Sequence, residues 1–306
     1  MFRVAAAGAG LVSLGVVGTT AVFLLLYAHP ALGVEGAWHF LVSSAWSPQA
    51  GVVGVGGLLA GSVLIAGIAL AVGLPIALAA AIFVNEYAPP WLRRLMVPLM
   101  DLLAALPSLV FGMWGFFALQ PYLVGPARWL GTYLSAIPIF RLTPQAAGRP
   151  AALASSAFVA GVVVGVMIVP VIASITRDVL ARCPRDQCEA ALALGGSRWG
   201  MVRDVILPFG RTGVVGATLL GFGRAAGETI AIALILAPLA PQLQTHVLEA
   251  GGGSVGAFIV TQFGEGGAGL ARSGLVAAGL ALFAVTLLVT IAARSIVARA
   301  SLRSAR

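Results

Sequence analysis

The sequence contains no lysine, because all 18 residues counted as Lys or Arg are arginines. A phosphate-binding P-loop requires a lysine, so the chain carries no standard motif for nucleotide hydrolysis. Schiff-base chemistry on a lysine amine is excluded for the same reason. If ATP drives this protein, a separate polypeptide must bind it.

Charge is scarce as well: 9% of the 306 residues are charged and 60% are hydrophobic. Soluble domains carry about 25% charged residues, so a polytopic membrane protein is the common class with this composition. The net charge of +8 does not indicate nucleic-acid binding, because the arginines flank apolar segments. We expect no cofactor, no metal site and no nucleic-acid partner.

There are only two cysteines, Cys183 and Cys188, five positions apart in a loop that we assign to the cytoplasm. Cysteines in that reducing compartment normally stay as thiols. We therefore expect reduced bystanders, and neither a disulfide nor a metal pair.

Six apolar stretches are long enough, at about 20 residues each, to cross a membrane as helices. We place them at residues 8–28, 57–83, 96–119, 151–175, 212–237 and 273–297. The sequence thus predicts an all-α fold, a polytopic bundle of six transmembrane helices. We divide it into an anchor helix with an external linker, a transmembrane domain and a basic cytoplasmic tail, at residues 1–56, 57–297 and 298–306. The first apolar run exceeds the ~7–15 residues of a signal-peptide core, so we expect an uncleaved anchor.

The arginines predict how the bundle is oriented. With the N-terminus inside, thirteen arginines fall on the inner face and four on the outer face, at Arg128, Arg141, Arg149 and Arg272. Because cytoplasmic loops carry the excess of basic residues, this bias favours both termini in the cytoplasm of a plasma-membrane protein. The external segment at 238–271 predicts a flexible loop around a short helix at 255–263.

The cytoplasmic loop at 176–211 predicts a helix, a glycine turn and a second helix. Pro184 suits a helix start, and Gly195 with Gly196 permits a left-handed stop, which gives a first helix at 184–194. Ser197 caps a second helix at 198–207, which Pro208 ends or kinks. Such a compact element suits docking to a partner, through the small side chains of Ala190 and Ala191, but its residue types fit an ordinary solvated loop equally well.

The fifth apolar stretch carries two charges, Arg224 and Glu228, next to Thr229. An ionised residue at mid-membrane costs roughly 2.5–3.5 kcal/mol, so such residues usually face a bundle interior or an aqueous path. Four positions apart on a helix, the two charges share one face and can neutralise each other. A structural pin and a transient contact of Arg224 with an anionic substrate are both compatible with this placement.

Glycine spacing gives two further predictions. Residues 51–61 are rich in glycine without any dinucleotide-binding spacing, so we expect close helix packing there. Gly223 and Gly227 form a small-x-x-x-small pair, which predicts close packing of the fifth span against a neighbouring helix.

The cytoplasmic loop resembles the coupling loop of membrane subunits of ATP-driven importers. Residues Glu189 to Gly195 read EAALALG, and Val205 to Pro208 read VILP at the expected distance. In that family the loop docks onto a separate ATPase and transmits its closing motion. The resemblance implies coupling roles for Glu189, Ala190, Ala191, Gly195, Leu207 and Pro208.

Four local matches together resemble phosphate ABC importer permeases of the PstC type, with a type I (MetI-like) fold. They are the coupling loop, NEYAP at 85–89, LAALPSLVFGMWG at 103–115 and GRAAGETIA at 223–231. The resemblance implies phosphate import by alternating access, with Arg224, Glu228 and Thr229 on the substrate path. It also implies four kinds of partner: a PstA-type permease subunit, two PstB-type ATP-binding subunits, an external PstS-type phosphate-binding protein and the lipid bilayer.

Other functions compete with this interpretation. A permease for molybdate or sulfate, or the sister PstA-type subunit, would share the loop and the charged pair. A membrane enzyme is disfavoured because His29, His39 and His246 are far apart in sequence and no nucleophile motif is present. An ATP-independent channel offers no reason for a coupling loop.

Overall fold

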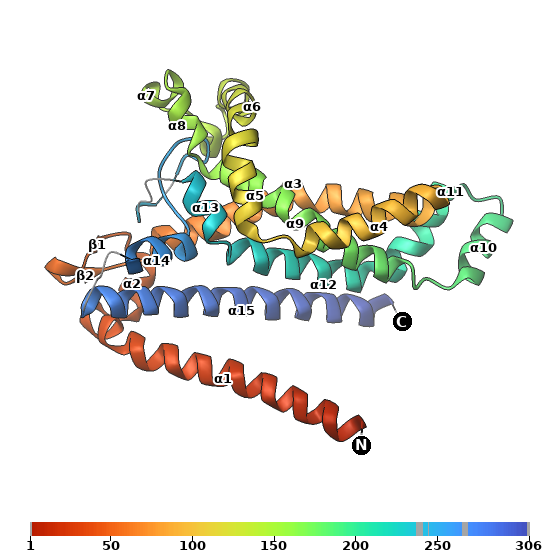
Figure 1. The fold of residues 1–306 in the computed structure, drawn as a ribbon, viewed down its shortest axis with the longest axis horizontal. Helices are drawn as coiled ribbons and strands as arrows, with labels where there is room; N and C mark the ends of the chain where they lie inside the picture. The colour runs from red at the N-terminus through yellow and green to blue at the C-terminus, as the bar shows by residue number, and fades with distance from the viewer. Residues whose placement is uncertain (1, 237–240, 244, 265–268, 305–306) are drawn as a thin grey trace.

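The computed structural model describes residues 2–236, 241–243, 245–264 and 269–304, which form a bundle of long helices (Figure 1). Five helices run alongside one another: α1 (Phe2–Glu35), α3 (Gly56–Ile82), α9 (Ala157–Leu180), α12 (Leu207–Ala226) and α15 (Leu270–Ser304). Among the described residues, six helical segments are long and apolar enough to cross a membrane. The predicted all-α bundle with six transmembrane helices is therefore confirmed.

Shorter elements connect these helices. The helical ones are α2 (Ala37–Val42), α4 (Pro90–Ala105), α5 (Ser108–Trp114), α6 (Gln120–Tyr133), α7 (Pro144–Ala147), α8 (Pro150–Ala154), α10 (Arg185–Ala193), α11 (Arg198–Met201), α13 (Ile230–Ile235) and α14 (Val255–Gly264). Two single turns are 3₁₀-helical, η1 (Pro48–Ala50) and η4 (Pro138–Phe140), and three are π-helical, η2 (Phe83–Tyr87), η3 (Gly115–Leu119) and η5 (Val202–Ile206). One antiparallel hairpin of β1 (Trp46–Ser47) and β2 (Val52–Val53) follows α2. The helix α14 confirms the short helix predicted at 255–263.

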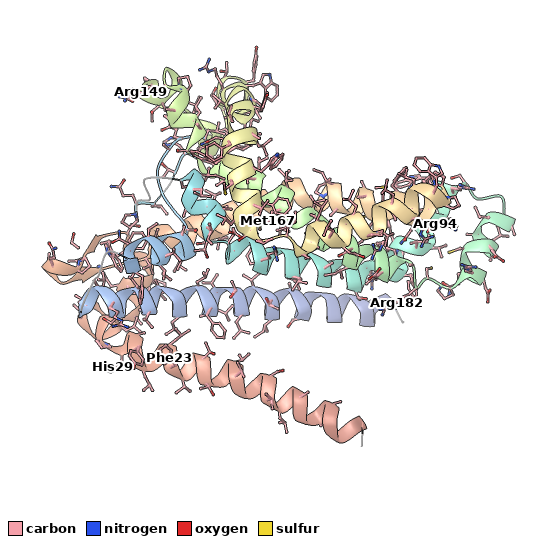
Figure 2. All side chains as sticks on the ribbon, viewed as in Figure 1. Phe23, His29, Arg94, Arg149, Met167 and Arg182 are labelled. Atoms are coloured by element: carbon pink, nitrogen blue, oxygen red, sulfur yellow. The ribbon has the colours of Figure 1, made fainter. Side chains whose placement is uncertain are left out.

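Helix α9 forms the centre of the core. It packs against α3, α12 and α4, and Met167 at its middle is buried (Figure 2). Over the most apolar 18 residues of α9, 61% of the residues are buried, whereas none is buried over the most apolar 18 residues of α1. Helix α1 touches α15 near its own C-terminal end, where Ala28 and Ala31 are buried, and most of its residues from Ala6 onward are exposed.

Glycines allow α3 and α9 to cross at very short range. A Cβ atom built on Gly73 of α3 would lie 2.7 Å from the carbonyl oxygen of Gly165 in α9. A Cβ on Gly161 of α9 would lie 2.6 Å from the side chain of Ile68. Small residues let membrane helices approach and gain dispersion contacts, which replace the hydrophobic effect as the packing force in lipid.

The glycines near residue 55 serve close packing too, but against another kind of neighbour than predicted. A Cβ on Gly57 would meet the backbone oxygen of Pro241, and one on Gly61 would meet that of Gly253. Neither neighbour is in a helix. The prediction of close approach is thus confirmed, while that of helix-to-helix packing is wrong at these two positions.

The predicted third span at 96–119 is not one continuous helix. Helix α4 ends at Ala105, because Leu106 precedes Pro107 and takes the extended conformation (ψ 139°) that a following proline favours. A second helical segment, Ser108–Tyr133, begins after the proline and reaches beyond the predicted end. Figure 1 shows α5 and α6 leaving the bundle at a steep angle to α9.

The two ends of the bundle differ. Helix α10 projects from one end, to which the beginning of α1 and the end of α15 also point (Figure 1). Arg94 and Arg182 lie at this end, whereas Arg149 lies at the opposite one (Figure 2). At that opposite end the backbone N–H of Val247 donates to Ile139, and the N–H of Phe158 donates to Val247, so loops distant in sequence are tied together.

We predict that Gly73→Ala destabilises the bundle by about 1–3 kcal/mol, because the new methyl group overlaps backbone of α9. Gly67→Ala is the matched control on the same helix, since nothing lies within 4 Å of a Cβ built there. It should be neutral or stabilising by up to about 1 kcal/mol, because alanine favours helix. Thermal unfolding in detergent measures both, and equal midpoints would contradict the crossing.

Candidate functional site

The fifth span breaks at the two charged residues. Helix α12 ends at Gly227, whose N–H still bonds to Gly223, and α13 begins only at Ile230. The predicted continuous helix over 212–237 is therefore wrong. The spanning segment is instead Arg198–Ala226, which begins well before the predicted residue.

Because of this break, Arg224 and Glu228 do not neutralise each other on one helix face. Among the described residues no ion pair joins them. Arg224 lies in the last turn of α12, where the helix dipole is negative and favours a cation. The buried carboxylate of Glu228 accepts the backbone N–H of Ala231 at 3.1 Å, at the positive start of α13. Each charge is thus compensated by a different helix end.

A cavity of about 1040 Å³ adjoins this break. Arg224 lines it together with residues of α1, α9, α12 and α15. The Nε atom of Arg224 is buried and has no hydrogen-bond partner, although the side chain as a whole is only half-buried. Thr229 is half-buried, and its hydroxyl donates to the carbonyl of Gly227 at 3.1 Å. A guanidinium with a free donor beside a cavity is equipped to meet an anion.

Gly223 and Gly227 line the same cavity rather than a helix seam. No neighbouring side chain or helix lies within 4 Å of a Cβ built on Gly223, and one on Gly227 would meet only the oxygen of Gly223. The predicted close packing at this pair is wrong. The missing side chains widen the space in front of Arg224 instead.

The predicted first loop helix is present as α10, one residue shorter at each end. It ends in a Schellman turn: Gly195 has φ +84°, its N–H bonds to Leu192, and the N–H of Gly196 bonds to Ala191. Pro184 caps the helix from outside rather than opening it. Ser197 accepts the N–H of Gly200 at 3.0 Å, as the predicted cap of the next helix.

The second loop helix is not separate from the fifth span. It runs through Pro208 without a stop, because the π-helical turn η5 precedes the proline and the N–H of Leu207 bonds to Val202 five residues back. The proposed end at 207 is therefore wrong. The second loop helix and the helix that carries Arg224 are thus one continuous segment.

The loop forms an exposed knob at the end of the bundle (Figure 1). Glu189, Ala190, Gly195 and Pro208 are exposed, whereas Ala191 and Leu207 are half-buried in a small apolar cluster with Met201. The two alanines therefore do not share one outer face.

Leu194 and Trp199, which sequence reasoning did not single out, are 90% and 56% exposed. Exposed apolar side chains mark a docking site where they gather into a patch. In the sequence, only their position next to the glycine turn at 195–196 could have indicated these two side chains.

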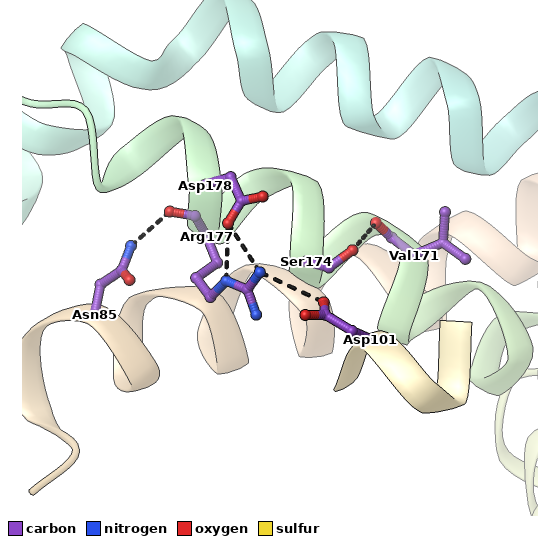
Figure 3. A network of polar contacts seen from close by, with 6 residues as sticks. All are labelled: Asn85, Asp101, Val171, Ser174, Arg177 and Asp178. Carbon is purple, nitrogen blue, oxygen red and sulfur yellow. Dashed lines mark hydrogen bonds and ion pairs between the residues drawn. The ribbon is translucent and has the colours of Figure 1, made fainter. Parts of the chain in front are cut away.

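A polar network at the base of this loop was also missed (Figure 3). Arg177, buried near the end of α9, donates to Asp178 at 2.8 and 3.0 Å and to Asp101 of α4 at 3.4 Å. Asn85 of η2 donates its side-chain N–H to the carbonyl of Arg177 at 2.8 Å. The network joins three segments at the point where α9 passes into the loop. In the sequence, only the Arg177-Asp178 pair at the end of an apolar stretch indicated it.

The two cysteines lie beside this network. Their sulfur atoms are 3.8 Å apart, and both cysteines are free. Burial, followed by the neighbouring thiol of Cys188 and the carboxylate of Glu86, raises the pKa of Cys183 to about 11. The Cys183 thiol is thus neutral at pH 7. Within the described ranges no three His, Cys, Asp or Glu side chains cluster closely enough to hold a metal ion.

Comparison with known proteins gives one consistent result. The family described as binding-protein-dependent transport system inner membrane component matches residues 73–302. The phosphate transport system permease protein PstC 2 of Mycobacterium tuberculosis is 38% identical, covering 97% of this chain and 90% of the relative. The corresponding PstC protein of Haemophilus influenzae is 35% identical, covering 91% and 89%.

The chain therefore belongs to the binding-protein-dependent transport system inner membrane components and is a multi-pass membrane protein. Its resemblance to PstC-type permeases is confirmed by these relatives.

We predict that Asp178→Asn destabilises the protein by about 1–2 kcal/mol, because the buried guanidinium of Arg177 then donates to a neutral amide oxygen in place of a carboxylate; the exposure of Asp178 keeps the loss below that of a fully buried pair. Asp204→Asn is the matched control, since its 3.8 Å contact with Arg203 joins two largely exposed side chains. Its effect should stay under about 1 kcal/mol. Thermal unfolding measures both variants. A larger loss of stability in Asp204→Asn than in Asp178→Asn would refute the importance of the network.

Proposed function

We propose that this chain is the permease subunit of an ATP-driven importer that moves inorganic phosphate across the cytoplasmic membrane. The observation that carries this proposal is Arg224, which lines a large cavity where a spanning helix is broken and whose buried Nε atom has no hydrogen-bond partner. Broken helices at membrane depth are tolerated where they line a cavity, and they commonly form substrate sites in transporters. The names of the relatives favour phosphate over molybdate or sulfate.

In this proposal Arg224 contacts the anion, while Glu228 and Thr229 hold the geometry of the break. Glu228 fixes the start of α13, and the Thr229 hydroxyl satisfies a carbonyl freed at the end of α12. Alternating access requires that the anion bind differently in the two states. A break between α12 and α13 gives the two halves of the span freedom to tilt separately.

A second permease subunit of the PstA type completes the pathway, and a PstS-type protein delivers phosphate from outside. Two PstB-type subunits hydrolyse ATP inside, and one of them binds the knob formed by α10 and its glycine turn. The exposed Leu194 and Trp199 supply its apolar contact. Because the segment from Arg198 to Ala226 is one continuous helix, the knob works as the end of a lever that reaches Arg224.

The transporting unit in this proposal is the domain at 57–297, with its coupling loop at 176–211. The segment before it anchors the chain, and the basic tail at 298–306 faces the cytoplasm together with the N-terminus. A membrane-impermeant maleimide should therefore leave Cys188 unlabelled in sealed cells and label it after permeabilisation. Labelling from outside would overturn this orientation and with it the coupling role.

Replacing Glu189 by Ala, or Gly195 by Val, should abolish uptake while the protein still inserts. The valine is strained by the φ of +84°, so the turn that ends α10 deforms. Gly67→Ala is the matched control, since a Cβ there meets nothing within 4 Å and Gly67 does not line the cavity at Arg224. The measurement is labelled-phosphate uptake with ATPase activity in the reconstituted complex. Normal uptake in both mutants would rule out coupling through this loop.

Arg224→Gln should lower phosphate uptake about tenfold or more, because a hydrogen bond to a charged group contributes about 1.5–3 kcal/mol. Arg224→Lys keeps the charge without the planar fork and should be intermediate. Arg272→Gln, at a cation lying over the ring of Phe263, is the control. Unchanged uptake by Arg224→Gln at normal expression would refute contact with the anion, and preferential uptake of molybdate would redirect the substrate.

A further inference from the structure

A second cavity lies at the end of the bundle that carries α10, remote from Arg224. It has a volume of about 370 Å³ and lies among the starts of three helices. Arg93 of α4, Arg185 of α10 and Arg198 of α11 line it, with Glu86 as its one carboxylate. Arginines from three separate elements therefore converge on one space.

These three arginines are exposed to solvent. Among the described residues none of the three forms an ion pair, in contrast to Arg177 close by, which contacts two aspartates. Each also lies in the first turn of its helix, where the dipole is positive and a cation is unfavourable. A bound anion would relieve both the repulsion between the cations and their conflict with the helix ends.

The one carboxylate that lines the cavity, Glu86, opposes an anion, but the three arginines outnumber it. Cys183 and Cys188 also line it. Because the pKa of Cys183 is raised to about 11, its thiol carries no negative charge at neutral pH. The volume is about twelve times the roughly 30 Å³ that one water occupies, so a tetrahedral oxyanion fits with several waters.

We propose that this cavity binds a phosphate-class oxyanion through Arg93, Arg185 and Arg198. Guanidinium groups give paired, charge-assisted hydrogen bonds to such oxygens, and three of them surround one ion. The ion has two sources with the same chemistry: free inorganic phosphate and the phosphate of an anionic lipid headgroup. The site is distinct from the path at Arg224.

Occupancy has a mechanical consequence, which rests on the proposed function. An anion held by all three arginines fastens α10 and α11 to the start of α4. If α10 must move during transport, a filled site restrains it, so phosphate that accumulates on this side slows further import. Binding itself requires neither ATP nor transport.

The chain contains its own reporter, because its only two cysteines are both in this cavity. In the purified full-length chain in uncharged detergent at pH 7.5, N-ethylmaleimide labelling of Cys188 is followed by mass spectrometry. Inorganic phosphate is titrated against chloride at constant ionic strength. Phosphate should slow labelling with a saturable dependence. Each rate is compared with the chloride rate of the same variant, which removes effects on thiol reactivity.

Arg93→Gln, Arg185→Gln and Arg198→Gln should each raise the phosphate concentration for half-protection about tenfold, as expected for the loss of one hydrogen bond to a charged group. Arg198→Lys keeps the charge and should be affected less. Arg94→Gln and Arg182→Gln are matched controls, since these arginines lie at the same end of the bundle but do not line the cavity (Figure 2). Both should behave as the unmodified chain.

Four outcomes decide. Equal rates of Cys188 labelling in phosphate and in chloride overturn the site for inorganic phosphate. If nanodiscs with anionic phospholipid nevertheless slow labelling where phosphatidylcholine nanodiscs do not, the site binds a lipid headgroup. Equal effects of Arg93→Gln and Arg94→Gln reduce protection to general charge attraction and overturn the site. If labelling of Cys188 slows only when the ATPase subunit is present, and phosphate has no effect, the anion site is overturned in favour of a protein ligand. None of these results bears on uptake through Arg224.

The feedback is tested separately in proteoliposomes of the complete complex. Lumenal phosphate should reduce the initial rate of uptake, and the ratio of loaded to unloaded rates should rise towards one in Arg93→Gln. An unchanged ratio overturns the restraint while leaving binding intact. Absence of uptake in the unmodified complex instead refutes the proposed function, so the two failures are distinguishable.

Discussion

A backbone in a lipid bilayer has to satisfy every N–H and C=O group within the protein, and the rest of this structure depends on that constraint. It makes the spanning segments helical and makes every interruption expensive. The chain interrupts helices at Leu106–Pro107 and at Gly227–Thr229. At the second break the freed groups are taken up by the Glu228 carboxylate and the Thr229 hydroxyl. The polar residues there are thus required by the break as much as by any substrate.

Charge follows a related rule, since a buried ion needs compensation where water is absent. Arg177 is compensated by two aspartates, while Arg224 and Glu228 are compensated by opposite helix ends. Arg224 keeps a buried Nε donor without a partner, as Arg177 does with Nη1, but Arg224 lines the larger cavity and has no ion pair among the described residues. The arginines around the smaller cavity are exposed and form no ion pair among the described residues, and under the proposal above an anion from outside the chain binds between them.

Mechanical continuity links the two cavities. The helix that carries Arg224 begins at Arg198, in the exposed knob, and the π-turn before Pro208 keeps it continuous. The Arg177 network ties α9, α4 and η2 together at the point where α9 enters the knob. In the proposed mechanism, a partner that moves α10 acts on both ends of the loop. It acts on the continuous helix from Arg198 to Ala226 at one end and on the hydrogen-bond network around Arg177 at the other.

Much of the fold could be predicted from the sequence, because length and apolarity decide what crosses a membrane. The first helix of the loop at 176–211, its glycine stop and its serine cap also follow from local chemistry, and they appear within a residue of the expected positions. Other features depend on contacts between residues far apart. Predicting from spacing alone that Gly223 and Gly227 pack against a helix failed, since only the neighbouring helices determine whether a small residue faces a partner or a cavity.

The sequence by itself determined the membrane class, the helical spans and the kinds of residue placed at their ends, since these depend on hydrophobicity and on local backbone preference. Only the tertiary structure decided which charges are compensated and which are left free. Charge compensation depends on distances between segments such as α4, α10 and α11, and sequence spacing does not fix those distances.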